Sequence, residues 1–290
     1  MFSGLATALI TPMRADGSID EAGLRQLVRF QEERGVRALV PCGSTGESAT
    51  LDHEEHLQAI RIVVDEARKA KIIAGTGSNS TAEAIHLSRG AQDLGADGLL
   101  SVSPYYNRPT PAGIIGHFKA ISDAVDIPII VYNIPSRTGS NITSATMLEL
   151  AKLPNVAGAK EASGDINQIA RIIAGAPRDF TVLSGDDGMT LPAMALGAKG
   201  VISVASNIVP ERMLRLVNEM LEGRLEDARR TNQELLPLFS ALFLETNPQP
   251  VKAAARLMGL PAGPLRMPLC DMGPANLESL KKVLAQYGLV

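Results

Sequence analysis

Tryptophan is absent from this chain of 290 residues, and aromatic residues make up only 3% of it. The chain also lacks any block of lysine or arginine, and its formal net charge is -3 at pH 7. Binding to a nucleic-acid backbone requires a basic surface, and binding to single strands requires aromatic side chains on which bases can stack. We therefore predict no nucleic-acid partner.

Long apolar runs and grouped cysteines are lacking as well. No uninterrupted apolar stretch approaches the roughly 18 residues that a membrane-spanning helix needs, so we predict no membrane partner. Cys42 and Cys270 are too few and too far apart in sequence for a disulfide framework or a zinc site. The N-terminal apolar run has no basic residue before it and a proline directly after it, which is typical of a strand and not of a secretory signal. These features predict a cytoplasmic location and no metal.

Short apolar runs rich in valine, isoleucine, leucine and alanine recur along the chain, and each precedes a loop and an amphipathic helical stretch. Their apolar character is nearly continuous, which is typical of parallel strands that are buried on both faces. A strand, loop and helix repeated eight times closes into an α/β TIM (β/α)8 barrel. The eight predicted strands are Leu5–Ile10, Ala38–Pro41, Ile72–Ala74, Gly98–Val102, Pro128–Tyr132, Val156–Lys160, Thr181–Ser184 and Gly200–Ser203.

The C-terminal part of the sequence has a purely helical periodicity. Helical stretches are predicted over Pro210–Phe243, Pro250–Met258 and Ala275–Tyr287. We expect a catalytic barrel over residues 1-224 and a C-terminal helical extension over residues 225-290, packed on the barrel or on a partner subunit. No low-complexity linker separates the two parts.

Lysine placement is the sharpest indication of chemistry. Active sites of such barrels are formed by the loops that follow the strands, and Lys160 is the only lysine that ends a predicted buried strand. The small and apolar residues before it favour the neutral, nucleophilic amine, although its pKa would have to fall by about 2 to 3 units for efficient attack on a carbonyl. The alternative is a structural lysine in a salt bridge, for example with Glu161.

Three other patterns indicate different chemistry with less specificity. Gly75–Ser80 follows a strand and opens a helix, as in dinucleotide-binding loops, but Asp97 begins its strand where the ribose-binding acid would end one. His53 and His56 share a helix without an evident third ligand, which favours a solvated polar face over a metal site. Asp186–Asp187 could bind a divalent ion, as in metal-dependent aldolases, or form part of a pocket loop.

Several separated motifs occur in a characteristic order. Gly43–Glu47 reads Gly-Ser-Thr-Gly-Glu, Tyr132–Pro135 reads Tyr-Asn-Ile-Pro, and Lys160 ends the following strand. Over nearly the whole chain this combination resembles the dihydrodipicolinate synthase and N-acetylneuraminate lyase family. Arg137 and the paired tyrosines at 105–106 are similar to the synthase branch, whereas the sugar-acid lyases generally lack that arginine.

The resemblance implies an enzyme without a cofactor. Its reaction would condense pyruvate with L-aspartate 4-semialdehyde through a Schiff base on Lys160, in the diaminopimelate route to lysine. Tyr132, Ser44 and Tyr106 would form a relay of three hydroxyl groups, with Tyr106 reaching in from a neighbouring subunit. From burial alone, either tyrosine could instead be a core ring whose hydroxyl bonds the backbone.

The resemblance also implies which residues bind the substrates. Ser44 and Thr45 would hold the carboxylate of pyruvate, although the synthases usually carry threonine where Ser44 stands. Arg137 would bind the carboxylate of the aldehyde, and the backbone of Gly185 and Ile202 would frame the pocket.

A regulatory site and an assembly are implied in the same way. The resemblance predicts a homo-oligomer, most simply a tetramer built as a dimer of dimers, and inhibition by lysine. From spacing alone, Glu83 could instead be the capping-box partner of Ser80, and the histidines could be a solvated helix face. The residues that match the allosteric pocket of lysine-sensitive synthases are Ser48, Ala49, His53, His56, Asn79, Glu83 and Tyr105.

Two other functions remain open from the sequence. One is a class I aldolase or lyase of the same family that cleaves a 2-keto-3-deoxy sugar acid, which Arg137 argues against. The other is a non-catalytic relative that binds a metabolite, which the intact set of Lys160, Tyr132 and Arg137 argues against.

Overall fold

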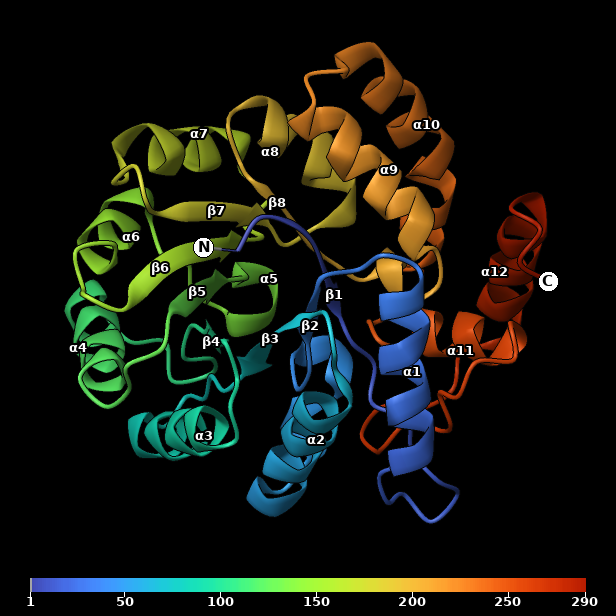
Figure 1. The fold of residues 1–290 in the computed structure, drawn as a ribbon, viewed down its shortest axis with the longest axis horizontal. Coiled ribbons are helices and arrows are strands. Elements are labelled where there is room, and N and C mark those ends of the chain that lie inside the picture. Colours follow the sequence, from blue (N-terminus) through green and yellow to red (C-terminus); the bar gives the residue numbers. More distant parts are fainter. Residues whose placement is uncertain (1) are drawn as a thin grey trace.

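The fold is taken from a computed structural model that describes residues 2–290. Each of the eight predicted strands is present, and together they form a closed parallel barrel in the order β1-β2-β3-β4-β5-β6-β7-β8 (Figure 1). The predicted fold class is therefore confirmed. The strands are β1 Gly4–Ala8, β2 Ala38–Val40, β3 Lys71–Gly75, β4 Gly98–Val102, β5 Ile129–Asn133, β6 Val156–Glu161, β7 Thr181–Ser184 and β8 Gly200–Ser203.

Helices surround the barrel and cover the outer face of the sheet (Figure 1). Side-chain caps define several of their starts: the Asp52 carboxylate and Glu55 form a capping box at the start of α2. The helices are α1 Glu21–Glu33, α2 His53–Glu66, α3 Thr81–Asp93, α4 Pro111–Ser122, α5 Pro135–Thr138, α6 Ser144–Leu150, α7 Ile166–Gly175, α8 Thr190–Ala195, α9 Pro210–Leu221, α10 Leu225–Ala241, α11 Gln249–Leu257 and α12 Pro274–Gln286.

Two hydrophobic cores follow from the alternation of side chains along each strand. The larger core lies between the strands and the helices. The smaller one fills the barrel interior with alanines and branched side chains and includes Tyr132 and Ile202. Because side chains close the barrel from within, only the loops at its ends can form a site.

The helical extension lies against the barrel at one side (Figure 1). The last helix, α12, contacts both α10 and α11, and α10 packs along α9. The predicted boundary at residue 224 falls at the turn between α9 and α10. The single predicted stretch from Pro210 to Phe243 is in fact two helices, because the chain turns at Gly223, whose φ of 75 suits glycine.

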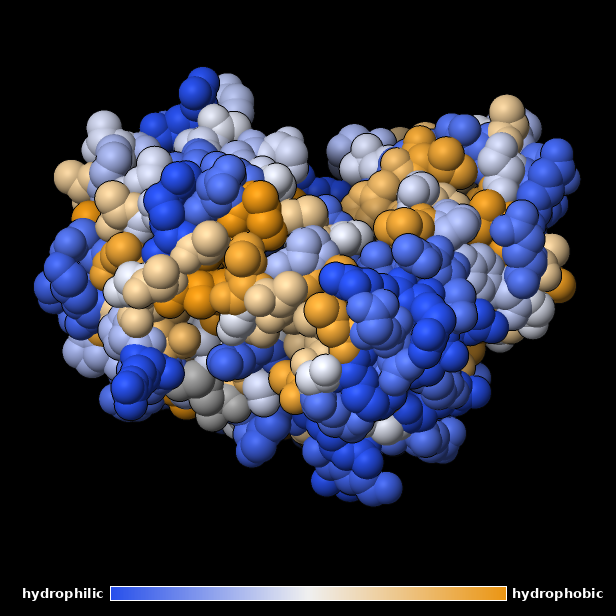
Figure 2. All heavy atoms as spheres, turned by 90° about the horizontal axis from the view of Figure 1, so that it is seen from above, coloured by the Kyte–Doolittle hydropathy of each residue, from blue (hydrophilic) through white to orange (hydrophobic). Residues whose placement is uncertain are grey.

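The outer surface differs between two neighbouring parts. Figure 2 shows hydrophobic residues gathered over α7 and α8, hydrophilic residues over α9 and α10, and a hollow in the outline between two lobes. Leu196, just after α8, is 41% exposed. None of the helices within residues 2–290 combines the length and apolar character that crossing a membrane requires.

Candidate active site

Lys160 and Tyr132 are direct partners in the pairing of β5 and β6. Both side chains are buried, and the Nζ of Lys160 lies 4.2 Å from the centroid of the Tyr132 ring. Within residues 2–290 the Lys160 amine has no ion-pair partner. The salt bridge to Glu161 that the sequence left open is therefore not formed. The hydroxyl of Tyr132 is likewise not tied to a described backbone group. Among the described residues this lysine is therefore a buried amine without a direct ion-pair partner.

Burial sets the acidity of the lysine. Removal from water lowers the pKa of Lys160 to about 8, the nearby Asp187 carboxylate opposes this shift, and the Arg137 guanidinium adds to it. The shift has the size that the sequence argument required. Burial also raises the pKa of Tyr132, so its hydroxyl stays protonated and can donate a hydrogen bond.

Gly185 gives the lysine its space. A Cβ at this position would lie 3.1 Å from both Cγ and Cε of Lys160 and 2.8 Å from the Cβ of Ala162. A side chain here would therefore push the lysine out of its place. The glycine is explained by this close approach, since its φ is not in the left-handed region.

The loop after β2 supplies two hydroxyl groups. Ser44 and Thr45 lie in a short 3-10 helix, Ser44–Gly46, and Thr45 is buried. The chain leaves this helix through Glu47, whose φ of 57 is left-handed and unusual for a residue other than glycine. The Glu47 carboxylate holds this conformation by an ion pair with Lys252, in which Nζ and Oε1 are 2.6 Å apart.

Arg137 lies in the single turn α5, where the chain rises from β5. Its Nη2 donates to the backbone oxygen of Asn247 at 2.7 Å, and the Nδ2 of Asn247 donates to the Oγ1 of Thr45 at 2.9 Å. Sequence reasoning missed Asn247, because it was restricted to strand ends and this residue follows α10. The only available signal was an asparagine before a proline ahead of a helix.

One cavity unites most of the predicted catalytic and substrate-binding residues. Ile202 is not among its lining residues, because its side chain belongs to the barrel interior, and Val204 from the loop after β8 lines the cavity instead. Phe243 and Asn247 line it from the extension. The predicted residues brought together here are Ser44, Thr45, Tyr132, Arg137, Lys160 and Gly185.

Tyr106 does not reach this cavity in its own chain. It is 90% exposed, and its φ of 71 is left-handed, which is strained for a residue with a side chain. Its backbone N–H donates to the oxygen of Thr138, and the neighbouring Asn107 donates from Nδ2 to the backbone oxygen of Asn79 at 2.9 Å. The loop therefore holds the ring away from the chain that carries it.

A second cavity of about 360 Å³ adjoins the first, since Ser44, Arg137 and Asn247 line both. Its volume lies in the range of small-molecule sites. Asn79 is not among its lining residues, although its backbone oxygen anchors the adjacent loop. Six of the seven residues predicted for lysine binding do line it: Ser48, Ala49, His53, His56, Glu83 and Tyr105.

Glu83 combines the two roles that the sequence left open. Its backbone N–H donates to the Ser80 hydroxyl and so caps α3, but its side chain does not return to Ser80 as a capping box requires. The carboxylate instead contacts the Ser78 hydroxyl and the Nε2 of His53, the latter at 2.7 Å. Hydrogen bonds from Ser78 and then His53 lower the pKa of Glu83, which keeps it anionic at the cavity.

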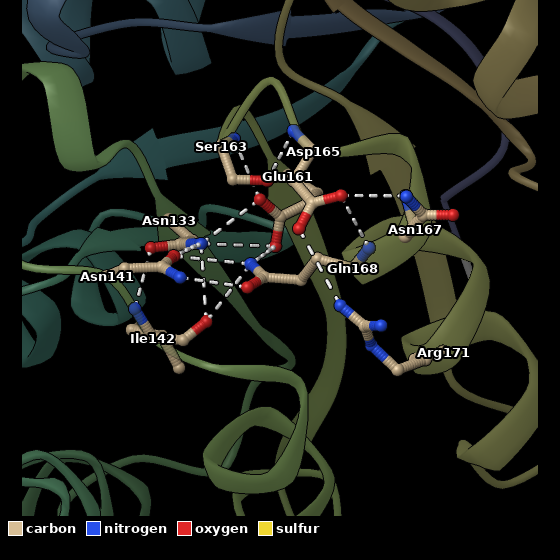
Figure 3. Close-up of polar contacts among 9 residues, drawn as sticks. All are labelled: Asn133, Asn141, Ile142, Glu161, Ser163, Asp165, Asn167, Gln168 and Arg171. Carbon is tan, nitrogen blue, oxygen red and sulfur yellow. Dashed lines mark hydrogen bonds and ion pairs between the residues drawn. The ribbon is translucent and has the colours of Figure 1, made fainter.

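A polar network lies behind the lysine, on the outer face of the same two strands. Figure 3 shows Glu161 surrounded by amide groups: the Nδ2 of Asn133 donates to both carboxylate oxygens at 3.0 and 3.2 Å. The Ser163 N–H donates to Glu161 at 2.8 Å and Gln168 Nε2 at 3.3 Å. Burial raises the pKa of Glu161, and the hydrogen bonds from Ser163 and Asn133 oppose that shift. Asn133 and Glu161 are paired in register, one step beyond Tyr132 and Lys160.

The two consecutive aspartates after β7 differ in role. Asp187 is buried, and its Oδ2 accepts hydrogen bonds from the backbone N–H groups of Val204 and Ala205 at 3.0 and 2.8 Å. Burial raises its pKa to about 6. Asp187 therefore joins the loop after β7 to the loop after β8. Among residues 2–290 no group of three or more histidine, cysteine or acidic residues has the arrangement of a metal site.

Comparison with known proteins shows that the chain is similar to one family over almost its whole length. The model of the dihydrodipicolinate synthetase family matches residues 1–287. The 4-hydroxy-tetrahydrodipicolinate synthase of Syntrophotalea carbinolica is 52% identical over 291 residues, covering 100% of this chain and 99% of its own length.

Two solved structures superpose over the full length. Dihydrodipicolinate synthase of Acinetobacter baumannii, complexed with pyruvate, has a TM-score of 0.98 and 40% identity and covers 100% of both chains. The enzyme of Cyanidioschyzon merolae, with lysine bound, has a TM-score of 0.97 and 42% identity and covers 100% of this chain and 99% of its own.

Proposed function

The chain belongs to the dihydrodipicolinate synthetase family, and we infer that it catalyses 4-hydroxy-tetrahydrodipicolinate synthesis, a step of the diaminopimelate route to lysine. The single observation that carries the residue assignment is the unpaired amine of Lys160, buried at a strand end and facing a cavity. With a pKa of about 8, roughly 10% of this amine is neutral at pH 7, against roughly 0.03% for an ordinary lysine. The neutral form is the nucleophile.

In the proposed reaction the Nζ of Lys160 attacks the C2 carbonyl of pyruvate, and loss of water leaves an iminium. Loss of a proton from the methyl carbon gives an enamine. This carbon then adds to the aldehyde carbon of L-aspartate 4-semialdehyde, whose oxygen takes up a proton. The amino group of the second substrate finally attacks the imine carbon, closes the ring and displaces the lysine as a free amine.

We assign the binding of the two carboxylates to separate groups. Ser44 and Thr45 hold the pyruvate carboxylate through their hydroxyl groups, and Arg137 binds the carboxylate of the aldehyde through its guanidinium, which suits bidentate contacts. Gly185 and Ile202 keep their predicted framing roles, Gly185 through the space it leaves for Lys160 and Ile202 through the core below the pocket.

Proton transfer requires hydroxyl groups, because the four histidines lie on helices outside this cavity. We propose that Tyr132, Ser44 and Tyr106 form the relay. Tyr106 belongs to it only if a second copy of the chain supplies the ring, which agrees with its exposure and with the strained loop that holds it outward. The catalytic unit is then at least a dimer.

We propose that two such dimers associate into a tetramer. The hydrophobic area over α7 and α8 is a surface that such a contact would cover, and Leu196, which directly follows α8, is exposed (Figure 2). In this assembly residues 1-224 carry the catalytic lysine, and the extension over residues 225-290 lines the pocket through Phe243 and Asn247. A cytoplasmic location fits the two free cysteines, Cys42 and Cys270.

We further propose that lysine binds the second cavity and inhibits the enzyme. The Glu83 carboxylate offers an anion for the ligand's ammonium group, and His53, His56 and Asn79 offer further polar groups on or next to the cavity. Tyr105 lines the cavity and directly precedes Tyr106, so a ligand there could disturb the relay. Lysine bound to the Cyanidioschyzon merolae enzyme supports this assignment.

The proposed chemistry is tested by reduction of the Schiff base. Borohydride added with pyruvate should inactivate the enzyme and add one pyruvate-derived mass to the peptide that contains Lys160, as measured by mass spectrometry. Turnover should then be compared between L-aspartate 4-semialdehyde and a panel of 2-keto-3-deoxy sugar acids. Modification of another lysine, or preference for a sugar acid, would contradict the assignment.

A further inference from the structure

Asn247 contacts both carboxylate-binding elements of the proposed site, although it belongs to neither. Its side-chain Nδ2 donates to the Thr45 hydroxyl at 2.9 Å, and its backbone oxygen accepts from the Arg137 guanidinium at 2.7 Å. The residue is buried and lines both cavities. It lies in the extension, between α10 and α11, far in sequence from the two residues that it joins.

The contact to Thr45 has a definite direction. An amide nitrogen can only donate, whereas a hydroxyl has one hydrogen to donate and lone pairs to accept with. Because the Thr45 oxygen accepts from Asn247, its own hydrogen is left for another acceptor. The carboxylate of a 2-keto acid in the cavity is such an acceptor, and a hydroxyl that is already fixed loses less freedom when it binds.

The position of Asn247 is itself fixed by burial. The helix α11 begins two residues after it, and Lys252 on this helix forms the ion pair with Glu47, with both side chains 0% exposed. The Lys252 amine also donates to the backbone oxygens of Thr11 and Pro264 at 3.0 and 2.7 Å. The extension is thus bound at two points to the loop that carries Thr45, and a break in such a buried pair is costly.

One polar atom at this position has no partner among the described residues. The side-chain oxygen of Asn247 is buried and accepts no hydrogen bond. A buried acceptor without a donor is unfavourable, and in native structures such groups call for a functional explanation. A residue retained only for packing would be better replaced by an apolar side chain of similar size.

We propose that Asn247 is a positioning residue for both substrate carboxylates, an inference that rests on the proposed function. Its side chain directs the Thr45 hydroxyl toward the carboxylate of pyruvate. Its backbone oxygen holds Arg137 where the carboxylate of the second substrate binds. The extension therefore takes part in substrate recognition, and the two halves of Asn247 serve different substrates.

This division makes Asn247→Ala a sharp test, because the substitution removes the side chain and keeps the backbone oxygen. The pyruvate concentration that half-saturates borohydride trapping should rise about tenfold, the loss expected for one hydrogen bond. The KM for L-aspartate 4-semialdehyde should change by less than about twofold, because the contact to Arg137 remains. Asn276→Ala is the matched control, since Asn276 donates to Glu245 in the same extension at 2.9 Å outside both cavities.

A double-mutant cycle with Thr45→Val shows whether Asn247 acts through the hydroxyl. In that background Asn247→Ala should weaken pyruvate binding no further. Additive effects, equal changes for both substrates, or no change would overturn the proposal. Asn247→Ser serves in place of alanine if thermal unfolding shows that the alanine variant does not fold. If borohydride does not trap pyruvate on Lys160 in the wild type, the proposed function itself is wrong. That result is distinct from the variant results, which test Asn247 alone.

Discussion

The two faces of the β5 and β6 pair are built on opposite principles. On the inner face, Tyr132 and Lys160 are buried polar groups whose amine and hydroxyl have no described backbone or charged partner. On the outer face, one residue further along each strand, Asn133 and Glu161 are buried polar groups bonded from several sides (Figure 3). Adjacent positions in the same strands therefore provide reactivity and rigidity separately.

The difference follows from the energetics of buried polar groups. A hydrogen-bonded group costs little to bury, and it joins the elements that share the bond. Burial of an unpaired ammonium group is destabilising, and it lowers the pKa of the amine. A larger fraction of the amine is then neutral and can act as the nucleophile. The satisfied outer pair keeps the strands in register while the unsatisfied inner pair meets the substrate. Four substitutions test this contrast, from the largest expected effect to the smallest.

Lys160→Met removes the inner polar group and keeps its length. Activity should fall by at least about a thousandfold because the nucleophile is lost, and borohydride trapping should disappear. Stability should rise in the same variant. The pKa of Lys160 is lower in the folded protein than in the unfolded chain, so the folded state is penalised while the lysine is protonated, below about pH 8, by up to about 3 kcal/mol. The penalty disappears as the pH rises through about 8 towards the unfolded value.

The measurement is denaturant unfolding of the wild type and Lys160→Met at pH 7 and at pH 10. The gain in unfolding free energy should be about 1 to 3 kcal/mol at pH 7 and about a quarter of that at pH 10, which still lies just below the unfolded pKa. Lys152→Met is the matched control, because this lysine is exposed and paired with Glu149. A less stable Lys160→Met variant at pH 7 would mean that the amine has a partner in solution.

Glu161→Ala instead removes the carboxylate at the centre of the outer-face network. The amides of Asn133 and Gln168 lose their shared acceptor, and we expect a loss of about 3 kcal/mol in unfolding free energy, with a smaller loss of about 1 kcal/mol for Glu161→Gln. Trapping of Lys160 should persist in both variants under folding conditions. Thermal and denaturant unfolding give the first result and mass spectrometry the second, with the exposed Glu149→Ala as control. A variant that stays fully stable but loses trapping would assign Glu161 to the chemistry.

Glu83 shares features of both faces: its carboxylate is hydrogen-bonded, as Glu161 is, yet it lines a cavity, as Lys160 does. If lysine binds there, Glu83→Ala should raise the lysine concentration for half-inhibition about tenfold, within the usual range of allosteric coupling, while activity without lysine stays near the wild-type value. Glu54→Ala, on the exposed side of α2, is the control. The measurement is initial rate against lysine concentration; an enzyme indifferent to millimolar lysine would refute the regulatory proposal and leave the catalytic one intact.

Sequence patterns predicted the strands and the inner-face lysine far better than the polar network on the outer face. The eight strands and the place of Lys160 followed from local features, because a run of apolar residues and the residue that ends it are contiguous. The network of Glu161 and the bridge through Asn247 join residues from different repeats, and no local pattern indicates which polar groups will meet. The exposure of Tyr106 also has no local signal, since its strained φ arises from contacts of the folded loop. Ile202 was assigned to the pocket through its backbone by resemblance alone, and its side chain belongs to the core inside the barrel.

The smallest expected effect concerns the charge that opposes the low pKa of Lys160. Asp187 is the largest electrostatic influence on Lys160 after burial, and it raises the lysine's pKa. Its own pKa, about 6, means that the carboxylate is ionised where Lys160 titrates. Asp187→Asn removes this charge while the amide oxygen can still accept from the N–H groups of Val204 and Ala205. The pKa of Lys160 should therefore fall further below 8.

The pH dependence of the trapping rate measures this change directly. For the wild type the rate should rise with pH and level off above about pH 8, because only the neutral amine attacks. For Asp187→Asn the same curve should shift to lower pH by less than about one unit, the size expected for one neighbouring charge. Asp186→Asn is the control, because Asp186 is not among the groups that shift the lysine. A shift to higher pH would contradict the sign of the interaction, and it would mean that Asp187 acts on Lys160 through the loop after β8 and not through its charge.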